Sequence, residues 1–180
     1  MTAVVEYEVI REHGPVEIRK YPELTLASVF DASDDFAFSI LFDYISGNNV
    51  PNQSIAMTAP VLSKKPGGHK IAMTTPVISG KGSFSFVLPS TYYQQNAPVP
   101  KDPAIKIERV PARLLAVIRF SGRAHEQDLR SEEEILLSTL ALTNIKSIGE
   151  PFLMRYNSPF TPGFLRHNEL ANEIAMEDKS

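Results

Sequence analysis

The sequence contains no cysteine, so disulfides, thiolate metal sites, iron–sulfur clusters, a cysteine nucleophile and covalent c-type haem attachment are excluded. It also lacks an excess of charge of one sign, because 18 Lys+Arg stand against 21 Asp+Glu, a formal net charge of −3 at pH 7. That balance provides no long-range attraction for nucleic acid or an anionic membrane surface, and we expect neither as a partner. No apolar run approaches the roughly 18 residues of a membrane span, and the N-terminus lacks the basic-then-apolar layout of a signal peptide. We therefore expect a cytoplasmic protein.

Motifs that mark common catalytic and metal sites are also missing. The chain has no Gly-x-Ser-x-Gly elbow, no phosphate-cradling glycine loop and no Rossmann fingerprint. Its 4 histidines are scattered and show neither an HExxH motif nor paired metal-ligand spacing, so we do not expect bound zinc. Dispersed residues can still converge in space, and this keeps an enzyme open as an alternative.

The composition that is present is typical of one strand-rich globular domain over residues 1–180. Of its residues 43% are hydrophobic and 22% charged, and 14 prolines and 9 glycines divide it into short segments. Two helices are predicted: 33–47, with a Ser33 cap, acids in the first turn and a glycine stop, and about 124–142. Alternation and β-branched or aromatic content predict strands at 7–10, 16–21, 24–30, 54–61, 71–78, 83–88, 105–110, 114–120, 152–156 and 173–176.

Two internal repeats are present. The segment IAMTAPV at 55–61 recurs as IAMTTPV at 71–77, identical at six of seven positions. A fainter repeat spans half the chain and predicts a duplicated strand–strand–helix–strand unit with pseudo-twofold symmetry. Its four matching positions are Ile18, Pro22, Leu26 and Ala27, which recur 89 residues later as Ile107, Pro111, Leu115 and Ala116.

The order of these and further motifs resembles the SOUL / haem-binding protein family over nearly the whole chain. The motifs are YEVI at 7–10 with VEIRKY at 16–21, the two IAMT-x-PV segments, FVLPS at 86–90, VPAR at 110–113 leading to VIRFSG at 117–122, and RYNSPF at 155–160 with RHNE at 166–169. The resemblance implies an α+β fold, a distorted antiparallel β-barrel or paired sheets flanked by two main helices. In some relatives a histidine just before the tyrosine of the first motif is proposed as an iron ligand, whereas this sequence has Lys20 there.

The same resemblance implies non-covalent binding of haem or a related tetrapyrrole, as a carrier, buffer or sensor, in an apolar groove beside the first helix. That helix is almost entirely apolar from 36 to 45, and its apolar surface is wider than packing on one sheet face requires. One interpretation is that part of this surface lines a slot for a flat ligand, and the alternative is a core helix covered by sheet and loops. The candidate slot residues are Phe38, Leu41, Phe42 and Ile45.

Two methionines and two basic residues complete the candidate site. Met57 and Met73 qualify because thioethers adapt to planar aromatic ligands, with core packing as the alternative interpretation. A tetrapyrrole carries two propionates, so its site needs hydrogen-bond donors at the mouth. By resemblance Arg166 and His167 are best placed, although pairing of Arg166 with an acid such as Glu169 is an equal alternative. His167 is also the histidine that we would test as an iron ligand.

Two other functional classes stay open. Distant structural relatives of a duplicated architecture, the GyrI-like effector-binding domains, include small-molecule binders and some hydrolases. In a hydrolase, an acid such as Glu169 or Glu17 would act on a small substrate and would have a pKa raised by burial. In the third class, a protein-interaction module, the groove would receive a helix or peptide of a protein partner.

Overall fold

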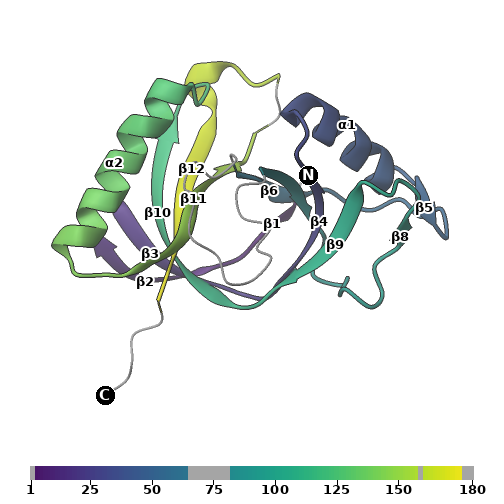
Figure 1. The fold of residues 1–180 in the computed structure, drawn as a ribbon, viewed down its shortest axis with the longest axis horizontal. Helices are drawn as coiled ribbons and strands as arrows, with labels where there is room; N and C mark the ends of the chain where they lie inside the picture. The colour runs from purple at the N-terminus through teal and green to yellow at the C-terminus, as the bar shows by residue number, and fades with distance from the viewer. Residues whose placement is uncertain (1–2, 65–81, 158–159, 176–180) are drawn as a thin grey trace. The chain divides into compact units, whose positions relative to one another are not determined.

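The computed structural model describes residues 3–64, 82–157 and 160–175 and divides the chain into two units. Unit 1 comprises Met1–Val4 and Leu24–Val110, and unit 2 comprises Val5–Glu23 and Pro111–Ser180. Each unit contains an antiparallel sheet and one long helix, and among the described strands neither sheet closes into a barrel (Figure 1). The expected α+β class with two main helices is confirmed, whereas the barrel alternative is wrong.

The sheet of unit 1 has the strand order β6–β7–β4–β9, with β1 added in parallel to β6. Its strands are β1 (Ala3–Val4), β4 (Leu24–Phe30), β6 (Thr58–Lys64), β7 (Ser83–Val87) and β9 (Ile105–Val110), and a separate pair is formed by β5 (Asn49–Val50) and β8 (Val99–Pro100). Helix α1 (Asp34–Ile45) begins after Ser33, whose hydroxyl accepts the Phe36 N–H and caps the helix as predicted.

One side of α1 packs against the sheet of unit 1 and forms the core of this unit. Positions 37, 41, 44 and 45 lie on one side of a helix, and their side chains are buried. They pack on inward-facing residues of β4, β7 and β9, namely Ala27, Val29, Phe84, Phe86 and Ile105. The Tyr44 hydroxyl, which is buried in this core, donates to the Pro98 carbonyl at 2.7 Å, so its polar atom is satisfied.

The sheet of unit 2 has the strand order β2–β3–β10–β12–β11. Its elements are β2 (Glu8–His13), β3 (Val16–Tyr21), β10 (Arg113–Ser121), α2 (Glu126–Leu142), β11 (Ser147–Arg155), the short 3₁₀ helix η1 (Gly163–Leu165) and β12 (His167–Ile174). Helix α2 buries Leu136 and Leu140 against apolar residues of β3, β10 and β12. In the described part of the chain, no helix combines the length and the hydrophobicity needed to cross a bilayer.

The predicted duplication is confirmed by the strand register. Ala27 of β4 pairs with Ile107 of β9, and Ala116 of β10 pairs with Ile18 of β3. These four residues are half of the eight repeat residues. The first strand of each half of the sequence therefore pairs with the second strand of the other half. The four-residue match therefore reflects a real structural equivalence.

Several predicted strands have different bounds in the structure. The strand at 54–61 begins later, at Thr58, and the strand expected at 173–176 is the end of β12, which begins at His167. The strand predicted at 71–78, together with Met73, lies outside the described residues. The error in β12 arises because its buried positions carry Asn168, Glu169 and Asn172, which conceal the usual apolar pattern.

The core packing of α2 makes a direct prediction about stability. Leu136→Ala removes a fully buried side chain and should lower the free energy of unfolding by about 2–5 kcal/mol. Leu142→Ala, in the same helix but 87% exposed, should change it by less than about 0.5 kcal/mol. Urea denaturation of both variants measures the difference, and equal effects would contradict the assigned packing.

Candidate functional site: a polar sheet face in unit 2 and an aromatic helix face in unit 1

Side chains alternate along each strand of the unit 2 sheet, so one face packs under α2, and the opposite face carries polar residues together with buried Leu115, Val117, Met154 and Ala171. Val16 and Ile18 of β3 belong to the apolar core under α2. Glu17, Arg19 and Tyr21 therefore project from the opposite side. We call this side the polar face and define it by Glu17, Arg19, Tyr21, Arg119, Tyr156, His167 and Glu169.

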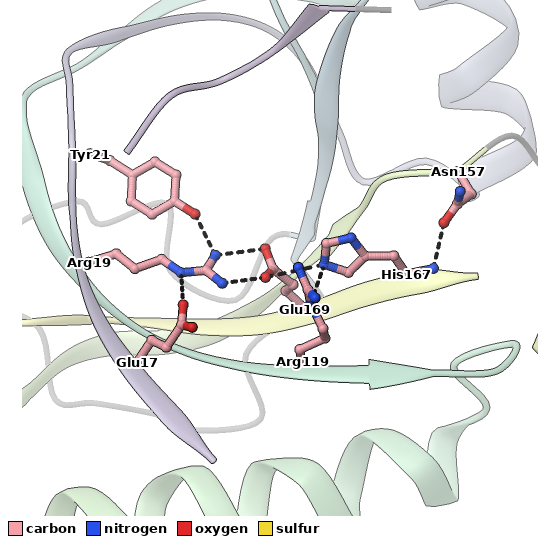
Figure 2. A network of polar contacts seen from close by, with 7 residues as sticks. All are labelled: Glu17, Arg19, Tyr21, Arg119, Asn157, His167 and Glu169. Atoms are coloured by element: carbon pink, nitrogen blue, oxygen red, sulfur yellow. Dashed lines mark hydrogen bonds and ion pairs between the residues drawn. The ribbon is translucent and has the colours of Figure 1, made fainter. Parts of the chain in front are cut away.

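A buried ion pair lies at the centre of the polar face. The Arg19 guanidinium donates to both oxygens of Glu169, with Nη1 to Oε1 at 2.8 Å and Nη2 to Oε2 at 2.6 Å (Figure 2). Arg19 is 2% exposed and Glu169 is 0% exposed. The Nε–H of Arg19 donates to Glu17 at 2.8 Å. This two-bond geometry is the strong form of an arginine–carboxylate contact and joins β3 to β12 across β10.

Aromatic rings surround the Arg19 guanidinium. Its carbon lies 4.1 Å from the centre of the Tyr7 ring, a cation–π distance, and its Nη1 donates to the Tyr21 hydroxyl at 2.9 Å. The Tyr7 and Tyr21 rings are 5.1 Å apart. Arg19 is therefore satisfied on its edge by oxygens and on its face by an aromatic ring, which offsets the cost of burying its charge.

The ionisation of this cluster is determined by the ion pair. Burial alone would raise the pKa of Glu169, but the hydrogen bonds from Arg19, with a further contribution from the Tyr156 hydroxyl, hold that pKa below its usual range. Burial, followed by the neighbouring Glu169 charge, raises the pKa of Tyr156, so this phenol stays protonated. The expectation of a raised carboxyl pKa at Glu169 is therefore wrong, because its charge is paired rather than isolated.

His167 lies at the exposed margin of the polar face and is held on three sides. Its ring stacks on Tyr156 with 4.4 Å between centroids and 7° between planes, and its backbone N–H donates to the Asn157 side chain (Figure 2 shows the second contact). Its Nε2 accepts the Arg119 Nε–H at 3.0 Å and lies 3.3 Å from the Glu169 Oε2.

This geometry bears on iron binding by His167. The Nε2 lone pair is already used by Arg119, so this atom is not free to bind iron in the described arrangement. Within the described ranges, no group of three or more histidine, aspartate or glutamate residues is arranged to hold a metal ion. Iron ligation by His167 stays a prediction that would require Arg119 to move.

In unit 1, the outer side of α1 carries a pair of stacked aromatic rings. The centroids of the Phe38 and Phe42 rings are 6.0 Å apart with 15° between the ring planes, and the Phe38 and Phe86 rings are arranged edge to face with 5.4 Å between centroids. Phe42 is 48% exposed and Phe38 is partly buried. The pair is thus anchored to the core at one end and presents an aromatic surface at the other.

The structure separates the predicted site residues into several environments. Leu41 and Ile45 are buried in the core of unit 1, and Met57 is partly buried against the same core. Phe38 and Phe42 form the stacked pair described above. In unit 2, the Arg166 Nε–H donates to the Thr161 carbonyl at 2.9 Å, and Glu169 pairs with Arg19 instead of Arg166.

The sequence prediction missed Arg19, Tyr21, Arg119 and Tyr156. A signal for the first two was present, because a period of two along 16–21 places Val16 and Ile18 on one face and three polar residues on the other. No local signal relates Arg19 to Glu169, which is 150 positions away.

Structural comparisons identify the class of fold first. The C-terminal domain of EcmrR matches with a TM-score of 0.65 at 11% identity, covering 95% of this chain and 99% of that chain. An uncharacterized conserved protein from Listeria innocua matches with a TM-score of 0.60 at 11% identity, covering 89% and 92%, and a hydrolase from the same organism with 0.57 at 9% identity, covering 89% and 91%. At these identities the likeness shows the fold alone, an α+β fold.

The family model then defines the membership more closely. The model described as SOUL heme-binding protein matches residues 2–173, so the chain belongs to the SOUL heme-binding protein family. This match spans both units. A sequence comparison with curated proteins gives no match.

Breaking the buried ion pair should lower the free energy of unfolding. Arg19→Met leaves the Glu169 carboxylate buried without its cation and should lower the free energy of unfolding by about 3–5 kcal/mol. The double variant Arg19→Met/Glu169→Leu should recover much of that loss, because no unpaired charge remains. Arg130→Met, which disrupts an exposed pair with Glu126, is the control and should cost less than about 1 kcal/mol. Denaturant titrations measure all three, and additive losses in the double variant would contradict coupling of the pair.

The lowered pKa of Glu169 predicts a pH dependence. A carboxyl whose pKa is lower in the folded state adds stability that is fully present above its unfolded pKa and is lost as the pH falls through its folded pKa. The unsubstituted chain should therefore lose stability below about pH 4.3, the ordinary glutamate pKa, faster than the Arg19→Met/Glu169→Leu variant does. Unfolding free energies measured from pH 7 down to acid test this. Parallel curves for the two proteins would show that the pair has no such role.

Proposed function

We propose that this chain binds haem or a related tetrapyrrole non-covalently, with the exposed aromatic surface of α1 contacting the macrocycle. Membership of the SOUL heme-binding protein family supports this ligand class. The observation that carries the proposal is the Phe38–Phe42 stack, since Phe42 remains 48% exposed although the core of unit 1 is complete without it. Ligand pockets for flat molecules are lined mainly by such apolar and aromatic side chains.

The residues of α1 divide into supporting and contacting sets in this proposal. Leu41 and Ile45 hold the helix on its sheet, while Phe38 and Phe42 offer the ring surface. Burying the exposed half of a phenylalanine is worth about 1 kcal/mol, so several apolar contacts are needed for a useful affinity. Met57, partly buried against the same core, is a further candidate.

The proposal concerns the macrocycle and assigns no iron ligand. Phe38 and Phe42 suit a planar aromatic ligand, whereas the Nε2 of His167 is engaged by Arg119. Metal-free porphyrin and haem should therefore bind with similar affinity. A carrier, a buffer and a sensor would all use such a site.

The hydrolase alternative has less support. A general acid near neutral pH needs a raised carboxyl pKa, and the pKa of Glu169 is lowered while both of its oxygens accept from Arg19. The likeness to the Listeria innocua hydrolase concerns the fold alone at 9% identity. A binding role is accordingly the function that the geometry supports best.

Titration of the chain with haem and with metal-free protoporphyrin, followed by absorption, tests the proposal. Saturable one-to-one binding should weaken at least tenfold in Phe42→Asp, because an aromatic contact is replaced by a charge that must lose water, and a tenfold change is about 1.4 kcal/mol. Phe36→Asp is the matched control: Phe36 lies on the same helix and is 56% exposed, but it is outside the stacked pair. Equal weakening in both variants, or non-saturable binding in competition with apomyoglobin, would contradict the proposal.

A further inference from the structure

The segment that joins β11 to β12 in unit 2 exposes several large apolar side chains. Phe160 is 95% exposed, Phe164 is 79% exposed and Leu165 is 60% exposed. They are three of the five most exposed large apolar side chains in the described residues, and they lie within six positions of one another. Single apolar side chains are common on protein surfaces, whereas a group of them marks a surface that contacts another molecule.

Hydrogen bonds hold this segment in a defined conformation. The Gly163 carbonyl accepts the backbone N–H groups of Gly122 and Arg166, both at 3.1 Å, and the Thr161 carbonyl accepts the Arg166 Nε–H at 2.9 Å. A Cβ atom at position 163 would lie 2.9 Å from the Cγ of Arg123, so the glycine allows the Arg123 side chain to pack against this turn. The apolar side chains are therefore displayed by a braced turn of the chain.

The charged residues of this segment and of the loop beside it are basic. Neither 156–168 nor the adjoining 121–125 contains an aspartate or a glutamate. Arg166 lies in the first of these ranges and Arg123 in the second. The Arg123 side chain is exposed, and it forms no hydrogen bond or ion pair among the described residues. An exposed apolar group beside exposed cations suits a surface that is both apolar and negatively charged.

The net charge of the chain does not determine the energy of such a contact. The formal net charge of −3 acts at long range, whereas charges within a Debye length, about 8 Å at physiological ionic strength, act at contact. The acids that follow at the start of α2 are engaged within the protein. Glu126 lies 3.0 Å from Arg130, and Asp128 accepts the His125 N–H at 3.2 Å. The expectation of no membrane partner came from the net charge and does not take this local arrangement into account.

We propose that the 160–166 segment binds the surface of a lipid bilayer that carries anionic headgroups. Side chains as exposed as Phe160 and Phe164 protrude from the protein, and a bilayer accepts a protruding apolar group without a matching pocket. Phe164 and Leu165 enter the boundary between headgroups and acyl chains, and Arg123 pairs with the phosphate groups above it. Peripheral proteins bind membranes through this combination of buried apolar area and electrostatic attraction.

Sedimentation with lipid vesicles tests the proposal. The unsubstituted chain should bind vesicles of phosphatidylcholine mixed with phosphatidylglycerol more tightly than vesicles of phosphatidylcholine alone. Phe164→Ser/Leu165→Ser should weaken binding to the mixed vesicles about tenfold or more, because two apolar side chains no longer leave water on binding. Leu142→Ser is the matched control. It removes a side chain of α2 that is 87% exposed and should leave vesicle binding unchanged.

The contribution of charge is measured separately. Arg123→Gln should reduce the preference for the mixed vesicles about fivefold, the contribution of one basic residue at an anionic membrane surface, and should leave binding to phosphatidylcholine alone unchanged. Arg130→Gln replaces an exposed arginine on α2 and should leave the preference unchanged. Equal effects of the two arginine variants would contradict the role of Arg123.

Because the chain contains no tryptophan, a single one can report insertion. With mixed vesicles, the emission of Phe164→Trp should shift to shorter wavelength and be quenched by brominated lipid, whereas that of Leu142→Trp should show neither change. Absence of vesicle binding by the unsubstituted chain, or undiminished binding by Phe164→Ser/Leu165→Ser, would overturn the proposal. A dimer in analytical ultracentrifugation that this double variant dissociates, without any vesicle binding, would also overturn it and would assign the segment to a second copy of the chain.

Discussion

The polar face of unit 2 depends on the ion pair between Arg19 and Glu169. Each member is almost fully buried, so each would destabilise the fold severely without the other. The pair joins β3 to β12, the two strands on either side of β10, and therefore restricts which residues of these strands lie opposite one another. Further polar and aromatic contacts surround this ion pair. They come from Glu17, Tyr21, Tyr7 and Tyr156. A hydrophobic pair of similar size would impose no such restriction on orientation.

The duplicated architecture places a second polar contact at the corresponding position of unit 1. Glu108 occupies the repeat position of Arg19, since both follow the matched isoleucines Ile107 and Ile18. Its carboxylate accepts from the Ser28 hydroxyl at 2.9 Å, and Ser28 lies 2.6 Å from the Ser85 hydroxyl. Because the single Ser28 proton goes to Glu108, Ser85 donates to Ser28. Both units thus have a charged residue on the sheet face opposite the helix: Arg19 is paired with the opposite charge of Glu169, and Glu108 accepts a hydrogen bond from the Ser28 hydroxyl.

Much of the fold could be predicted from sequence because its signals are local. Strands 16–21, 24–30 and 105–110 have the predicted bounds, and Ser33 caps α1. Strand β12 could not be predicted as a whole, because its buried positions carry Asn168, Glu169 and Asn172, whose partners are distant in sequence. Asn168 donates to the Gly122 carbonyl, and Asn172 donates to Ile148 at the bulge of β11.

The candidate site was predictable only in part for the same reason. The wide apolar surface of the first helix predicted a ligand slot that included both Leu41 and Phe42. Only the structure shows that Leu41 is buried and that Phe42 is exposed. Arg119 has no distinguishing neighbours in sequence, and its contact with His167, 48 positions away, is visible only in the structure.

The pairing of charges on the polar face has a consequence for ligand selection. A buried carboxylate among tyrosines would attract a cation, but Arg19 already supplies one, so Glu169 is not available to a ligand. The aromatic surface of α1 favours a flat apolar group.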